Sequence, residues 1–90
     1  MNNTRRRAIT DLINRANEFG NNFGELVSDL EDIRDEEQDC LDNMPESLEG
    51  SDRYCCMEEA LQNLEDALEE AQGIVDSIDT MVSCLEDAGV

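Results

Sequence analysis

Asn43-Met44-Pro45-Glu46-Ser47-Leu48-Glu49-Gly50-Ser51 interrupts two long heptad patterns of nearly equal length. Pro45 disfavours helical geometry at the residue before it, so a first helix should end close to Asp42. Gly50 supplies a flexible residue, and the Ser51 side chain can cap the first turn of a second helix. The stretch therefore predicts a bend over residues 43–51, between helices at about residues 4–42 and 52–88.

Before the bend, apolar residues recur three and four positions apart, as the a and d positions of a coiled coil do. Gly20 and Gly24 would each cost about 1 kcal/mol inside a helix. The phase of the pattern is nevertheless unchanged across them, so we predict one continuous helix that is weakened there. Its predicted seam is Ile9, Leu12, Ala16, Phe19, Phe23, Leu26, Leu30, Ile33 and Cys40.

After the bend, the same pattern runs without interruption to Gly89, a residue type suited to a helix end. Two arms of matched length predict an all-α fold, a long antiparallel helical hairpin (coiled coil) that forms a single domain over residues 1–90. The seam predicted for the second arm is Tyr54, Met57, Leu61, Leu64, Leu68, Ala71, Val75, Ile78, Val82 and Leu85.

The position of the bend also predicts a register between the two arms. Placing Pro45 to Gly50 in the bend excludes a register shifted by a heptad, and it sets small residues against large ones. The predicted pairs include Ile9 with Leu85, Ala16 with Ile78, and Ile33 with Leu61.

A second apolar row runs beside each predicted seam. Three apolar positions per heptad are typical of a helix that faces more than one neighbour. We therefore predict dimerisation into a four-helix arrangement, and a monomer with partly exposed alanines remains the alternative. The row consists of Ile13, Val27, Ala60, Ala67, Ile74, Met81 and Ala88.

The charge is strongly negative: 24 acidic residues against six arginines and no lysine give a net charge of -18. Such a chain repels nucleic acid and anionic membranes and attracts basic protein surfaces. Asp11, Asn14 and Arg15 break any apolar run near the N-terminus, so we expect neither a signal peptide nor a membrane span. The expectation is a cytoplasmic protein that binds no nucleic acid directly.

Residues suited to catalysis are scarce, because the chain has no histidine and no lysine. This removes the usual general base, Schiff-base and zinc-ligand options. The carboxylates lack the glycine-containing loop of a calcium hand, and reduced thiols are the expectation for the four cysteines, with a Cys40 disulfide to Cys55 or Cys56 left open. We predict a protein without enzymatic activity, cofactor or metal.

The acidic residues are regularly placed and form the predicted partner-binding surface. Ordinary coiled coils intersperse lysine or arginine with glutamate, whereas like charges a turn apart repel. Rows of carboxylates on a helix offer a basic groove something like the backbone of a nucleic-acid duplex. A merely solvated face and halophilic adaptation remain alternatives. The predicted partner-binding residues are Asp11, Glu18, Glu25, Asp32, Asp39, Glu58, Glu59, Glu65, Asp66, Glu69 and Glu70.

Most of residues 30–88 resemble a family of short acidic helical proteins from phages and prophages of gut and other Firmicutes bacteria. The resemblance rests on the bend and its flanks: Asp35-Glu36-Glu37-Gln38, Asp42-Asn43-Met44-Pro45-Glu46-Ser47-Leu48, Ser51-Asp52-Arg53-Tyr54 and Asn63-Leu64-Glu65-Asp66-Ala67. It implies a phage or mobile-element setting and brings no catalytic residues.

By analogy with anti-CRISPR proteins, we expect an acidic phage-type inhibitor that mimics DNA. Its partner would be a basic, nucleic-acid-handling host defence protein, such as a CRISPR effector. The alternative is a homo-oligomeric coiled-coil scaffold, or an accessory protein of phage assembly or recombination.

Overall fold

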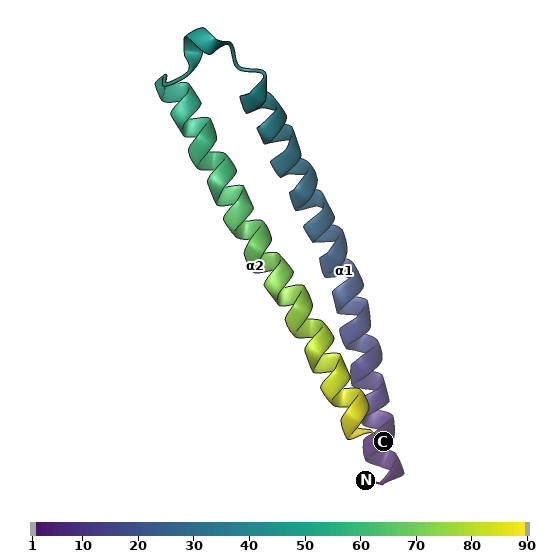
Figure 1. Ribbon diagram of the computed structural model, residues 1–90. Helices are drawn as coiled ribbons and strands as arrows, with labels where there is room; N and C mark the ends of the chain where they lie inside the picture. The colour runs from purple at the N-terminus through teal and green to yellow at the C-terminus, as the bar shows by residue number, and fades with distance from the viewer. Residues whose placement is uncertain (1, 90) are drawn as a thin grey trace. The chain divides into compact units, whose positions relative to one another are not determined.

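The computed structural model describes residues 2–89, which form two α-helices joined by a short bend (Figure 1). Helix α1 spans Asn3–Asp42 and continues through Gly20 and Gly24 without a break, and helix α2 spans Asp52–Ala88. A 3-10 helix, η1, occupies Glu46–Leu48 between them. The predicted all-α helical hairpin is confirmed. Across residues 2–89, neither α-helix has a stretch long and apolar enough to cross a membrane.

Local side-chain chemistry explains both ends of α1. At its start, the Arg5 N–H donates to the Asn2 Oδ1 over 2.8 Å, which satisfies one of the free amides of the first turn. At its end, the Asn43 backbone N–H and side-chain amide donate to the Asp39 carbonyl over 3.0 and 2.8 Å. Polar side chains thus cap the helix at each end.

The bend follows from three residues of its sequence. Pro45 has extended backbone, with a φ of -58° and a ψ of 143°, so it cannot continue α1. Gly50 has a φ of +78°, a left-handed conformation that residues with a Cβ rarely adopt. The Ser51 Oγ then accepts a hydrogen bond from the Tyr54 N–H over 3.2 Å, which confirms the predicted N-cap of α2.

The chain divides into two compact units, each with a segment of α1 antiparallel to a segment of α2. The terminal unit consists of Met1–Leu26 with Gln72–Val90. The bend unit consists of Val27–Ala71.

The most buried residues all lie in the bend unit: Val27, Leu61, Leu68 and Ala71, which are 6 to 9% exposed. On α2, every residue of the predicted seam is buried or half-buried. In the described part of the terminal unit, no side chain reaches the same burial, and its seam residues are only half-buried. The hydrophobic core is therefore concentrated in the bend unit.

The seam predicted for α1 consists of two columns of residues, each repeating every seventh position. One of these two columns is wrong. Leu12, Phe19, Leu26 and Ile33 are 45, 57, 53 and 53% exposed, and Cys40 is exposed as well. The residue after each of them faces α2 instead. Three adjacent columns of α1 carry apolar residues, and a pair of helices can bury only a narrow stripe of them. The column that occupies the seam is Ile13, Gly20, Val27, Arg34 and Leu41.

The predicted register is also wrong, by one helical turn. A methyl group on Gly20 would lie 3.5 Å from the Ile78 Cγ2, whereas the predicted partner of Ile78 was Ala16. A methyl group on Gly89 would lie 3.5 Å from the Ile9 Cγ2, although the predicted partner of Ile9 was Leu85. Both contacts belong to the terminal unit and shift the pairing in the same direction. Because Gly20 has no side chain, it leaves room for the branched Ile78.

Candidate functional site

The acidic column of α1 is exposed to solvent throughout. Its five residues recur every seventh position, and the geometry of an α-helix separates successive members by about 10 Å. Three of them lie in the terminal unit and two in the bend unit. In chain order the exposed residues are Asp11, Glu18, Glu25, Asp32 and Asp39.

The predicted partner-binding acids of α2 are likewise exposed, and all of them lie in the bend unit. A seven-residue spacing relates Glu58 to Glu65 and Glu59 to Asp66, so each pair shares one side of the helix. Together with Asp32 and Asp39 of α1, these residues give the bend unit eight of the predicted carboxylates. The α2 group is Glu58, Glu59, Glu65, Asp66, Glu69 and Glu70.

Negative charge is distributed very unequally between the two units. The bend unit has 17 acidic residues against two arginines, a net charge of -15. The terminal unit has seven acidic residues against four arginines, which leaves -3 of the total of -18. The acidic surface is thus mainly a property of the bend unit.

Few of these charges are neutralised by arginine. Within residues 2–89, Arg15 Nη1 lies 3.7 Å from Asp11 Oδ2, and Arg34 Nε lies 3.0 Å from Asp35 Oδ1. The Arg15–Asp11 side chains are 70 and 68% exposed, and such pairs contribute little to stability. Among the predicted partner-binding residues, Asp11 takes part in one of these two ion pairs. Asp66, another of them, accepts a hydrogen bond from Gln62 Nε2 over 3.0 Å. The acidic surface therefore keeps most of its charge available to a partner.

The negative field of the bend unit acts on Tyr54, the only tyrosine of the chain. Partial burial of the ring raises the pKa of Tyr54 above its ordinary value of 10.0, and the carboxylates of Glu58, Glu49 and Asp42 raise it further. Desolvation and negative neighbours both disfavour the phenolate. Tyr54 is therefore a natural reporter of the charge around the bend.

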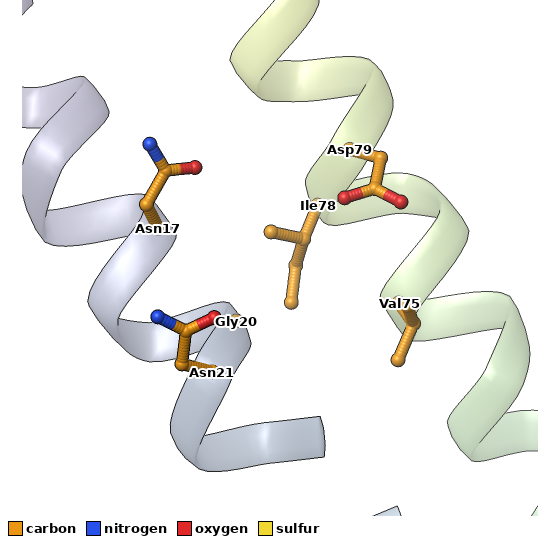
Figure 2. Close-up of a pocket in the computed structure, with 6 residues that line it drawn as sticks. All are labelled: Asn17, Gly20, Asn21, Val75, Ile78 and Asp79. Carbon is orange, nitrogen blue, oxygen red and sulfur yellow. The ribbon is translucent and has the colours of Figure 1, made fainter.

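A small cavity of about 130 Å³ lies beside the seam of the terminal unit (Figure 2). Ile78 points from α2 towards Gly20 of α1, and polar side chains flank this contact. The amides of Asn17 and Asn21 come from α1, and the carboxylate of Asp79 comes from α2. The cavity shows that Asn17 and Asp79 lie on the same side of the seam.

The four cysteines, Cys40, Cys55, Cys56 and Cys84, carry free and exposed thiols. Over residues 2–89, no group of three or more cysteine and acidic side chains is arranged to hold a metal ion. The predictions that the protein has no metal and no enzymatic activity remain predictions.

Sequence reasoning placed Ile74 and Met81 beside the seam, but it missed the exposed apolar side chains of α1 because it assigned Leu12, Phe19 and Leu26 to the seam. Phe19 is 57% exposed and stacks on Phe23, with ring centroids 6.2 Å apart and an interplanar angle of 14°. On α2, Ile74 and Met81 are 46 and 48% exposed. The glycine at Gly20 was the available signal, since a residue without a side chain permits close approach to a neighbouring helix.

Comparisons of the chain with protein-family models, with curated proteins and with solved structures found no match. The resemblance to phage proteins therefore stays a prediction.

Proposed function

We propose that this protein is a non-enzymatic inhibitor that binds a basic, nucleic-acid-handling host protein through the bend unit. Its carboxylates would occupy the place of nucleic-acid phosphates. The observation that carries the proposal is the concentration of exposed acidic residues in this unit, with a net charge of -15 and a single arginine ion pair within it.

The physical support for this proposal is electrostatic. Carboxylates one turn apart repel each other, and each like-charge pair costs a few tenths of a kcal/mol. The pairs Glu65–Glu69 and Asp66–Glu70 keep this repulsion, although the chain could use lysine to relieve it, and it uses none. A dense negative surface accelerates association with a basic groove and loses strength as salt is raised. A function in binding basic partners explains why the repulsion is tolerated.

The setting we propose is the cytoplasm of a bacterial host, with the protein encoded by a phage and directed against a defence nuclease. An RNA-guided nuclease of the CRISPR type is the first partner to test. Its nucleic-acid channel is positively charged and contacts the backbone of the bound duplex. A chain with rows of carboxylates matches that chemistry without reading any base sequence.

The test is competition between this protein and duplex DNA for purified RNA-guided nuclease complexes and other bacterial nucleases at low salt. We expect inhibition of DNA binding that weakens as salt is raised. A variant with six bend-unit acids changed to their amides should lose inhibition while keeping its helicity by circular dichroism. Its substitutions are Glu58→Gln, Glu59→Gln, Glu65→Gln, Asp66→Asn, Glu69→Gln and Glu70→Gln.

A control variant removes the four acids of the terminal unit that lie outside the predicted partner-binding surface, and it should keep inhibition. If no nucleic-acid-handling protein is inhibited, or if both variants lose inhibition equally, a specific acidic surface on the bend unit is refuted. The control substitutions are Asp76→Asn, Asp79→Asn, Glu86→Gln and Asp87→Asn.

A second candidate function is a homo-oligomeric coiled-coil scaffold, for example in phage assembly or recombination. The observation that favours it is the exposure of large apolar side chains on α1, such as Leu12, Phe19 and Leu26. A light-scattering measurement that finds a monomer at high protein concentration would exclude this candidate.

A further inference from the structure

The terminal unit has many apolar side chains but very little core. Its seam residues are half-buried, whereas five large apolar side chains are roughly half exposed. Isolated exposed leucines are ordinary on protein surfaces, but a regular set of them marks an interaction site. The exposed set in this unit is Leu12, Phe19, Leu26, Ile74 and Met81.

These side chains gather on one side of the helix pair. Asn17 and Asp79 each follow a seam residue, and both line the cavity on the same side of the seam (Figure 2). Since each residue turns a helix by about 100°, the position before a seam residue lies on the opposite side. Eleven residues of the terminal unit precede a seam residue, and six of them lie in the columns directly beside the seam. These six form the apolar face: Leu12, Phe19, Leu26, Ile74, Met81 and Ala88.

The apolar face and its border contain no acidic residue within the described terminal unit. The neighbouring outer columns carry alanine, arginine, asparagine, serine and cysteine, although the chain as a whole has a net charge of -18. The seven acids of this unit lie elsewhere on the two helices. The border residues are Ala8, Arg15, Asn22, Ser77 and Cys84.

We propose that the apolar face of the terminal unit is the docking surface for a second copy of the chain, paired face to face about a two-fold axis. A two-fold interface brings the same patch together from both copies, so a highly acidic chain can pair only where its surface lacks acids. Two-fold pairing through a face that carries acids would bring carboxylates of the two copies together and be opposed by their repulsion. The acid-free apolar face meets this requirement.

The available area is sufficient for a specific dimer. If each of the five exposed side chains and its surroundings contributes on the order of 100 Å² per copy, the interface buries on the order of 1,000 Å² over both copies, which is the lower end for a specific interface. Phe19 is already held by its stack on Phe23, so little side-chain freedom is lost when it is covered. Pairing would give the terminal unit the core that it lacks as a single copy.

This inference does not depend on the proposed inhibition, because the two surfaces involve different units and respond oppositely to salt. Screening of the carboxylates weakens attraction to a basic partner, but it also weakens repulsion between two acidic chains. Dimerisation should therefore strengthen as salt is raised. A loss of dimerisation and a loss of inhibition can be observed separately.

The experiment is sedimentation equilibrium of the full chain in reducing buffer, over a wide range of protein concentration and at two salt concentrations. We expect the 10.1 kDa chain to form a dimer. The double variant Phe19→Glu and Met81→Glu should raise the dimer dissociation constant by at least about 100-fold, since it places charges inside an apolar interface. Circular dichroism should show unchanged helicity, because both side chains are exposed in the single copy.

The matched control, Asn14→Glu and Thr80→Glu, adds the same charge at exposed positions away from the apolar face and should keep the dimer. If the glutamates at positions 19 and 81 reduce helicity, the milder pair Phe19→Gln and Met81→Gln replaces them. The proposal is overturned if the wild-type chain stays monomeric at every salt concentration. This holds even if a different protein is then found to cover the apolar face. The proposal is also overturned if the variants of the apolar face still form the dimer, or if the control variant weakens the dimer as much as they do.

Discussion

Replacing Leu61 by alanine should destabilise the protein far more than replacing Ile33 by alanine. The sequence pattern pairs these two residues across the seam and so predicts similar losses. In the structure, Leu61 is 8% exposed and Ile33 is 53% exposed, and both lie in the bend unit. The pair therefore tests which column of α1 faces α2.

The expected magnitudes follow from these exposures. A buried leucine truncated to alanine costs about 2–5 kcal/mol, and we expect about 2–3 kcal/mol at Leu61, because a seam between two helices can partly collapse. The Ile33 substitution should change the free energy of unfolding by no more than about 0.5 kcal/mol, since alanine also favours the helix. For a domain of this size, the difference corresponds to roughly 10–20 °C in Tm.

The measurement is urea and thermal unfolding followed by circular dichroism in reducing buffer. Neither substitution lies on the proposed dimer face, and repeating each melt at several protein concentrations separates folding from association. Equal losses for both variants would support the seam predicted from the sequence and refute the column of α1 that faces α2 in the structure. A stable Leu61 variant would show that the buried side chains of the bend unit contribute little.

Further predictions concern the bend and the glycines. Absorbance titration of Tyr54 should give a pKa above 10.0 that moves back towards this value as salt screens Glu58, Glu49 and Asp42. Because the pKa is raised in the folded state, the stability from neutral Tyr54 is fully present below about pH 10 and is lost as pH rises through the folded pKa. Gly73→Ala should raise the free energy of unfolding by up to about 1 kcal/mol, because the new methyl group meets nothing within 4 Å and alanine favours the helix. Gly50→Ala should lower the free energy of unfolding by about 1 kcal/mol, because the φ of +78° at this position strains a residue with a Cβ. Chemical denaturation measures the effect of both glycine substitutions.

The extent of correct prediction depended on how many apolar columns each helix carries. On α2, one pair of columns holds most of the large residues and the third column is mainly alanine, so its seam could be identified without the structure. On α1, the column of Leu12 and Phe19 is more hydrophobic than the column of Ile13 and Gly20 that faces α2. Periodicity alone favours the larger residues, whereas packing against Ile78 favours the glycine.

The acidic surface could be predicted because exposure of outward heptad positions depends only on helical geometry. The division of charge between the two units could not be predicted from the sequence. The boundary between the units, at Leu26–Val27 and Ala71–Gln72, depends on which segments pack together. The same is true of the α1 half of the apolar face, which can be identified only when the true seam is known.

By itself the sequence determined the two helices, the bend between Asp42 and Asp52 and the net charge of -18, because capping, proline geometry and composition act locally. Only the tertiary structure decided which side of α1 is buried and which turn of α2 it meets. Two helices can slide by a turn or rotate by a column at little local cost. The final position is set by close packing, with Gly20 against Ile78 and Gly89 against Ile9 in the terminal unit.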